Sequence, residues 1–167
     1  MKKLLNYSIL FAILFICTAC PYESATPIDI PKFPIDENLI GKWEEKGKDK
    51  SDKGKNFYDM QKLDNQQYSL IENTLNENSE TFTQKEFIAY ISQVDGQNFL
   101  NIQAKKKLQT FMLYKIDFSA DKKQLTLLPL SEYIKEKFTN SKDLREFIST
   151  HKHLSFFYGQ EMVLLKN

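Results

Sequence analysis

Hydrophobic and polar residues alternate with a period of two along most of the chain from residue 39 onward. Such alternation is typical of strands that bury one face. The predicted strands lie at 41–46, 57–63, 68–70, 87–92, 99–104, 111–118, 125–129 and 161–166. Short polar segments separate them, and Asp64-Asn65, Asp95-Gly96 and residues 119–123 are typical of tight turns. The pattern therefore predicts about eight strands, mostly antiparallel.

The period changes to that of a helix between residues 131 and 148. Ser131 can cap one short helix, and Asn140 or Ser141 can cap a second. The hydrophobic residues at helical spacing are Tyr133, Ile134 and Phe138, then Leu144, Phe147 and Ile148. The predicted class is mainly β, with residues 39–167 forming an antiparallel barrel of about eight strands. One or two short helices are inserted before the last strand.

Composition bears on what the barrel contains. Eight strands can close around a side-chain core or around one small ligand. The chain holds 13 Phe and 8 Tyr against 5 Gly. Large side chains of this kind fill small barrels, so we expect a mostly packed interior.

The first nineteen residues differ from the rest of the chain. Lys2 and Lys3 precede an unbroken apolar run at 9–16, and small residues follow it. This is the order of a secretory signal peptide. A membrane-spanning helix needs about twenty apolar residues. Polar residues at 6–8 and Pro21 interrupt or end the run, which favours a signal peptide at 1–19.

Both cysteines of the chain lie at the end of this leader. Thr18-Ala19-Cys20 resembles the lipobox of bacterial lipoproteins, in which a small residue precedes a cysteine that receives a diacylglyceryl group. Cys17 stands where that family usually has Leu. The resemblance implies that Cys20 is the lipidation site and the mature N-terminus. The alternative is a pair of buried cysteines in an ordinary hydrophobic anchor.

The resemblance also implies a location. Lipoprotein acylation supplies at least two acyl chains, which hold a protein stably on a membrane. Pro21 does not match the aspartate that retains many such proteins in the inner membrane, so we expect a lipid-anchored envelope protein at the outer membrane. Four of the five prolines lie between residues 21 and 34. They predict an extended, lipidated tether over 20–38.

Charge gives little indication of a partner. The whole chain has a formal net charge of +1, and cleavage after residue 19 removes two lysines and no acid, which leaves −1. Nucleic-acid binding would call for a basic face, so we expect no nucleic-acid partner. Residues 46–55 alternate Lys and Asp with two glycines. That pattern is typical of a solvated loop.

The start of the first predicted strand carries a family resemblance. Leu39-Ile40-Gly41-Lys42-Trp43 resembles the G-x-W motif of lipocalin-like (calycin) barrels. In that family the Trp packs across the closed barrel end beneath an Arg near the last strand. Here Arg145 is the single Arg and falls in a predicted helix, while the last strand offers Lys166. The resemblance implies that Gly41 and Trp43 mark a buried barrel end; a plain core role for Trp43 is the alternative.

The layout as a whole also resembles uncharacterised lipocalin-like lipoproteins of Bacteroidota. It implies a binding module for a small apolar or amphipathic ligand. The alternative is a lipoprotein with a packed barrel that binds a protein partner, as an inhibitor, immunity or assembly factor.

Candidate catalytic and metal-binding residues are few. His151 and His153 would share one strand face and could form half of a metal site, although they also follow a predicted helix, whose C-terminus stabilises histidine. Zinc would need carboxylates in addition, because the chain has no other His. Glu44 and Glu45 are adjacent and would point to opposite strand faces. No nucleophile elbow, Walker loop or dinucleotide fingerprint occurs. We expect a non-catalytic protein without a required metal or cofactor.

Overall fold

The computed structural model describes residues 21–47, 55–76, 78–106 and 109–167, so the predictions for the signal peptide, Cys17 and Cys20 lie outside the described residues. The strands are β1 (Glu23–Ser24), β2 (Gly41–Glu45), β3 (Asn56–Lys62), β4 (Tyr68–Asn76), β5 (Thr81–Val94), β6 (Gln97–Ala104), β7 (Phe111–Phe118), β8 (Gln124–Pro129) and β9 (Met162–Lys166). The helices are η2 (Glu37–Leu39), α2 (Ser141–His151) and η4 (Ser155–Phe157).

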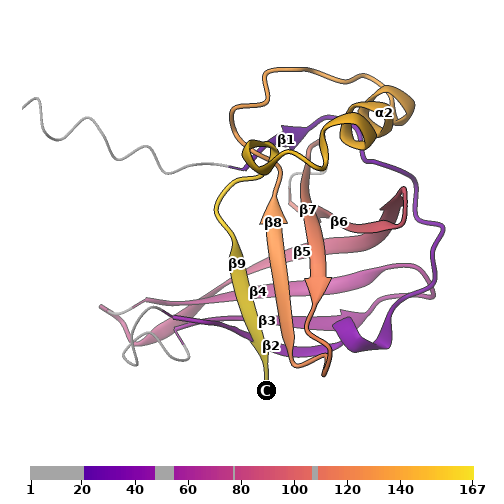
Figure 1. Cartoon of the computed structure of the whole chain (residues 1–167). Helices are drawn as coiled ribbons and strands as arrows, with labels where there is room; N and C mark the ends of the chain where they lie inside the picture. Colours follow the sequence, from indigo (N-terminus) through magenta and orange to yellow (C-terminus); the bar gives the residue numbers. More distant parts are fainter. Residues whose placement is uncertain (1–20, 48–54, 77, 107–108) are drawn as a thin grey trace, which may run out of the picture.

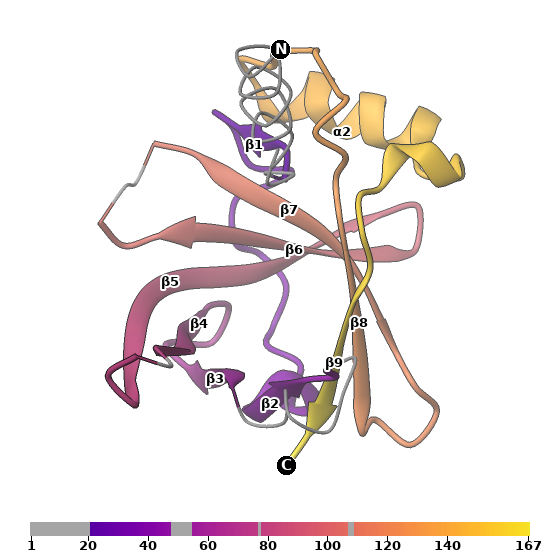
Figure 2. The ribbon, with the colours of Figure 1, turned by 90° about the vertical axis from the view of Figure 1, so that its left-hand side faces the viewer.

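These strands form one antiparallel sheet that closes on itself. Their order is β1-β7-β6-β5-β4-β3-β2-β9-β8, and β7 also pairs with β8. The last pairing closes β2 to β9 into an eight-stranded barrel, and β1 is an extra strand on β7 (Figure 1). Figure 2 looks into this barrel, with β1 and α2 above its rim. The predicted mainly-β class with a closed antiparallel eight-stranded barrel is confirmed.

The two ends of the barrel differ. The β2–β3, β4–β5 and β6–β7 connections leave the strands at one end, which we call the open end. The turns at 63–67 and 119–123 lie at the opposite end, which we call the closed end. The segment from β8 to β9 also leaves from the open end and contains α2, which lies over the outside of the barrel (Figures 1 and 2).

The second half of β5 and the middle of β6 and of β7 are buried on both faces. In β6, Leu100 and Ile102 belong to the core inside the barrel, while Phe99 faces a second hydrophobic cluster outside it. Leu144 and Ile148 of α2 are fully buried in that outer cluster. The outer cluster therefore fixes α2 to the barrel wall, which explains why residues 99–102 of β6 are all buried.

One of the two predicted helices is present. The side chain of Asn140 accepts a hydrogen bond from the Asp143 N–H at 2.9 Å and caps α2, as predicted. Residues 131–140, all described, contain a turn and no helix. Their backbone groups bind distant segments instead: the Ser131 N–H donates to the Phe157 carbonyl, and the Glu136 carbonyl accepts from the Tyr22 hydroxyl. No helix in the described ranges has the length and apolarity that a membrane crossing requires.

The segment before β2 differs from the predicted extended tether. Tyr22 and Ile28 are buried in the outer cluster. The Ile28 N–H donates to the buried Asn101 side chain at 2.9 Å, and Asp29 forms a 2.6 Å ion pair with Arg145 of α2. The tether prediction is therefore wrong for residues 21–38, because this segment supplies apolar side chains that complete the outer cluster. It is a strap packed on the barrel, and we call it the N-terminal strap.

Candidate ligand-binding cavity

The side chains inside the barrel lie in two rows across neighbouring strands. Register places Gly41, Met60, Leu70, Phe87 and Ala104 side by side in the row nearer the closed end. The second row, two residues further toward the open end, consists of Trp43, Tyr58, Glu72 and Lys85. Alternate residues of a strand face the same side. Both rows therefore face the interior, and the second one is polar from Tyr58 onward.

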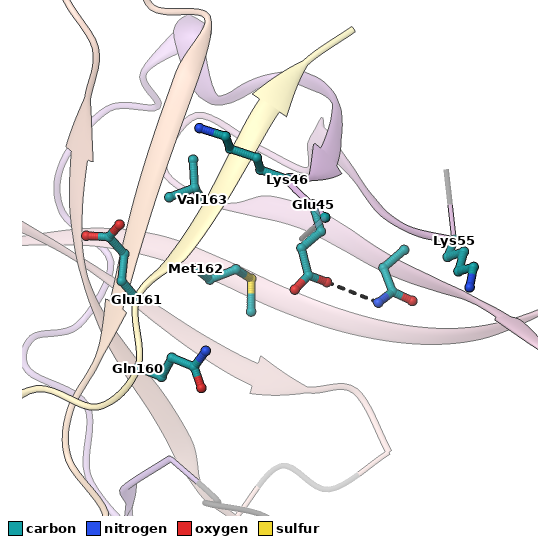
Figure 3. Close-up of a pocket in the computed structure, with 9 residues that line it drawn as sticks. Glu45, Lys46, Lys55, Gln160, Glu161, Met162 and Val163 are labelled. Carbon is teal, nitrogen blue, oxygen red and sulfur yellow. Dashed lines mark hydrogen bonds between the residues drawn. The ribbon is translucent and has the colours of Figure 1, made fainter. Parts of the chain in front are cut away.

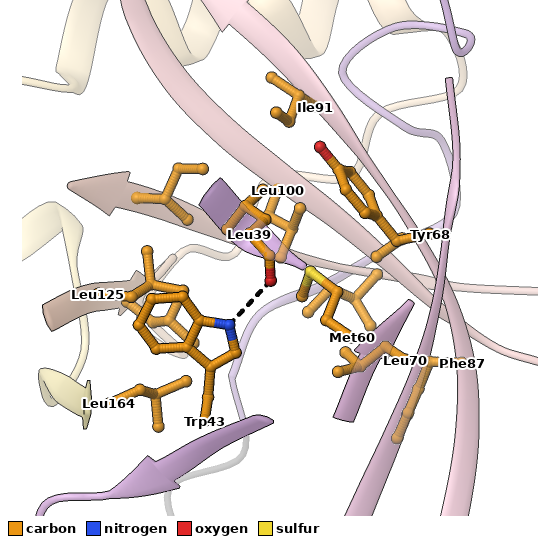
Figure 4. Close-up of a cluster of buried hydrophobic side chains, with 14 residues drawn as sticks. Leu39, Trp43, Met60, Tyr68, Leu70, Phe87, Ile91, Leu100, Leu125 and Leu164 are labelled. Atoms are coloured by element: carbon orange, nitrogen blue, oxygen red, sulfur yellow. Dashed lines mark hydrogen bonds between the residues drawn. The ribbon is translucent and has the colours of Figure 1, made fainter. Parts of the chain in front are cut away.

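A cavity of about 390 Å³ lies inside these rows. Its apolar lining consists of Trp43, Met60, Leu70, Phe87, Leu100, Ile102, Ala104, Met112, Leu125, Leu127, Met162 and Leu164, several of which are drawn in Figure 4. The volume falls in the range of roughly 300–1,000 Å³ that is usual for small-molecule sites. The expectation of a mostly packed interior is therefore wrong. Three flexible methionines and the small Ala104 border the space that the large aromatic side chains leave unfilled.

Charged groups line the same cavity toward the open end. Glu23, Glu72 and Lys85 all border it. Lys85 Nζ lies 3.4 Å from Glu72 Oε2, and the Lys85 side chain is 65% exposed. Glu23 accepts a hydrogen bond from the Thr110 hydroxyl at 2.9 Å. The cavity is thus apolar in depth and charged at its mouth, which suits an amphipathic molecule.

Two tyrosines complete the polar part of the lining. Burial and, to a lesser extent, the nearby Glu72 carboxylate raise the pKa of Tyr114 to about 12. Burial also raises the pKa of Tyr58 far above its ordinary value, with Glu72 and Glu45 adding to the effect. A low-dielectric site disfavours the charged phenolate. Both phenols therefore stay neutral at physiological pH and keep a proton that can be donated to a ligand.

Trp43 belongs to the second row, but the contacts of its ring lie toward the closed end, where β2 begins and where β7 and β9 end. Its side chain is fully buried, its indole N–H donates to the Leu39 carbonyl at 2.8 Å, and its ring lies 6.2 Å from that of Phe118 (Figure 4). Lys166 Nζ lies 5.2 Å from the centre of the indole and donates to the Asn38 carbonyl at 2.8 Å. The predicted burial of Trp43 is confirmed. A lysine of the last strand provides the cation over the ring.

Gly41 makes this arrangement possible. Its φ is +132°, a backbone conformation that residues with a side chain rarely adopt. A Cβ at this position would lie 3.1 Å from Cε of Lys166. The missing side chain therefore leaves room for the Lys166 stem beside Trp43.

Two further hollows adjoin the mouth of the cavity. One, of about 640 Å³, is bordered by Pro21, Tyr114, Tyr133 and Tyr158 among others. The other, of about 340 Å³, is shown in Figure 3, where the Glu45 carboxylate accepts a 3.0 Å hydrogen bond from Asn56. Met162 borders both hollows and the cavity itself. The open end thus presents three adjoining, partly apolar hollows that share lining residues.

The predicted metal ligands lie elsewhere. His151 is the last residue of α2, where its Nδ1 lies 2.8 Å from the Phe147 carbonyl and its ring stacks on Phe157. His153 is exposed in the turn that follows. The two histidines therefore do not lie on a strand, and the prediction that they share one strand face is wrong. Within the described ranges, no three His, Cys, Asp or Glu side chains gather closely enough to hold a metal ion.

The polar residues of the cavity were not predicted from the sequence. Glu72 and Lys85 share strand faces with Leu70 and Phe87, two positions away in each case. The same alternation that identified the core therefore places both charges on the inward faces of their strands, where they border the cavity at its mouth. The signal in the sequence is a charged residue two positions from an inward-facing apolar one.

Comparison with known proteins gives no relative: no family model, no curated protein and no solved structure matches this chain. The closed eight-stranded antiparallel barrel is compatible with a lipocalin-like fold.

Proposed function

We propose that this chain is a membrane-anchored cell-envelope lipoprotein whose barrel binds one small apolar or amphipathic ligand without catalysis. The single observation that carries the proposal is the apolar cavity of about 390 Å³ with Glu72, Lys85 and two neutral tyrosines toward its mouth. Burial of an apolar ligand there removes its surface from water, and the polar groups can hold a head group.

The cavity volume limits the size of the ligand. A water molecule's share of liquid volume is about 30 Å³. At that spacing a cavity of about 390 Å³ holds roughly a dozen non-hydrogen atoms. A longer chain would extend through the mouth into the adjoining hollow of about 640 Å³. We therefore expect a single-chain amphiphile of moderate length.

The anchor in this proposal is supported by Thr18-Ala19-Cys20 and by the apolar leader before it. Replacing Cys20 with Ser should abolish labelling by a fatty-acid probe and should cause unlipidated precursor to accumulate in cells. A matched Cys17→Ser variant should be labelled normally. Equal labelling of the Cys20→Ser variant would exclude Cys20 as the acylated residue.

Ligand binding can be tested on soluble residues 21–167, a boundary that keeps the buried Tyr22 and Ile28 in place. A fatty acid carrying an environment-sensitive fluorophore should gain emission on binding. Tyr58→Phe should weaken binding if its hydroxyl donates to the head group, whereas Tyr133→Phe should not. Stable capture of an envelope protein without probe binding would favour the partner-binding alternative instead.

A further inference from the structure

The first described residue of the chain borders the mouth of the cavity. Pro21 lines both the cavity of about 390 Å³ and the adjoining hollow of about 640 Å³. It is held there by the next residue, because the Tyr22 N–H donates to the Leu130 carbonyl at 3.1 Å and its hydroxyl donates to the Glu136 carbonyl at 2.9 Å. The described part of the chain therefore begins at the mouth.

We infer that the open end of the barrel is a membrane-docking face that lies against the bilayer. The inference rests on the proposed acylation of Cys20. Acyl chains on that residue enter the bilayer within one residue of Pro21, and the N-terminal strap leaves no free tether that would let the barrel turn away. It is fixed near its start by the β1–β7 pairing, in its middle by the ion pair between Asp29 and Arg145, and at its end by the Lys166 hydrogen bond to the Asn38 carbonyl.

The distribution of exposed aromatic side chains points to the same face independently. Among the large hydrophobic residues exposed in the described part of the chain, three are aromatic. They are Phe82, Tyr133 and Phe156, which are 46%, 77% and 72% exposed. Phe82 lies in β5, one residue after that strand begins at the open end. Tyr133 and Phe156 lie on the connection from β8 to β9, which also leaves the strands at the open end. The exposed residues of the closed-end segments include an aliphatic one, Leu63. Aromatic side chains are favoured where a protein meets the membrane interface.

This orientation gives the cavity direct access to the bilayer. The hollow that contains Tyr133 joins the cavity at Pro21 and Tyr114. An amphiphile can therefore pass from the outer layer of lipid into the barrel along a partly apolar path, without its chain crossing water.

The orientation can be measured with tryptophan emission and lipids brominated along their acyl chains, which quench tryptophan on contact. The full acylated chain, purified from membranes, is reconstituted in vesicles of phosphatidylethanolamine and phosphatidylglycerol. Tyr133→Trp places a reporter at the open end, and Leu63→Trp places a matched exposed reporter at the closed end. The emission of Trp43, measured in the unsubstituted chain, is subtracted from both.

We expect several-fold stronger quenching of the Tyr133→Trp reporter than of the Leu63→Trp reporter. Three outcomes in a chain that floats with the vesicles would overturn the docking face alone. They are equal quenching of the two reporters, no quenching of either, and stronger quenching at the closed end. A chain that does not float with vesicles would overturn the anchor, and the docking face with it. Quenching of Trp43, which lines the cavity, reports entry of a brominated chain and so tests ligand binding separately.

Discussion

Replacement of Trp43 by Ala should remove a large part of the stability of the barrel. An indole buries about 150–250 Å², which at about 25 cal/mol per Å² corresponds to roughly 4–6 kcal/mol. Buried aromatic-to-Ala substitutions cost about 3–5 kcal/mol, because the neighbours partly fill the space. Trp43 is fully buried, and the Leu39 carbonyl also loses the indole donor. We therefore expect a loss of about 3–5 kcal/mol from a total of roughly 5–15 kcal/mol.

The assay is urea unfolding, supported by thermal melting monitored by circular dichroism. The melting temperature of the Trp43→Ala variant should fall by on the order of 10 °C. Tyr133→Ala is the control, because this ring is 77% exposed and its loss should change the free energy of unfolding by less than about 0.5 kcal/mol. If the Trp43→Ala variant melted as close to wild type as this control, the barrel-end role of Trp43 would be refuted.

A double-mutant cycle isolates the contribution of Lys166. Lys166→Met keeps a stem of similar length and removes the ammonium that lies over the indole. The coupling between this change and Trp43→Phe should be about 0.5–1 kcal/mol, the usual value of an exposed cation–π contact. A coupling of zero would show that the two side chains are merely neighbours.

Three further outcomes are expected. Gly41→Ala should destabilise the barrel by about 1–3 kcal/mol, because alanine strains this backbone and its Cβ meets the Lys166 stem. Urea unfolding measures this loss, and an unchanged free energy of unfolding would contradict the prediction. Asp29→Ala should cost less than about 1 kcal/mol but speed proteolysis of the N-terminal strap, and unchanged cleavage counts against the Arg145 clasp. Tyr114 has a folded-state pKa raised to about 12, so its stability contribution is full below about pH 10 and is lost as the pH rises toward 12. Tyr114→Phe should reduce that alkaline loss in unfolding measurements, and an equal loss excludes this cause.

The barrel could be predicted from the sequence wherever one strand face is buried. The Asp95-Gly96 turn was also predictable, since both residues adopt positive φ and Val94 pairs with Gln97 across a two-residue loop. The extensions of β4 and β5 beyond the barrel were missed, because residues 81–86 are exposed and carry no alternation of apolar and polar side chains. Backbone pairing holds them together with cross-strand contacts such as the Gln84–Asn73 hydrogen bond and the Phe57–Phe82 ring contact. A hydrophobic pattern does not indicate such contacts.

The packing of the N-terminal strap and the cavity could not be predicted for a different reason. Four prolines indicate an extended backbone, but they do not indicate what Tyr22 and Ile28 contact. That depends on the outer cluster, which is assembled from segments distant in sequence. A cavity likewise depends on how side chains from six or more strands meet, and composition records only their total volume.

The most direct test of ligand binding in the barrel is native mass spectrometry of the full chain extracted from its own membranes. The account predicts a complex whose mass exceeds that of the acylated chain by a constant amount, the mass of one bound amphiphile. Ala104→Phe, which fills the cavity from β6, should lose this mass. Ala120→Phe adds the same side chain at an exposed closed-end turn and should retain it. A chain that carries no such mass, or an Ala104→Phe variant that carries as much as wild type, would contradict the account.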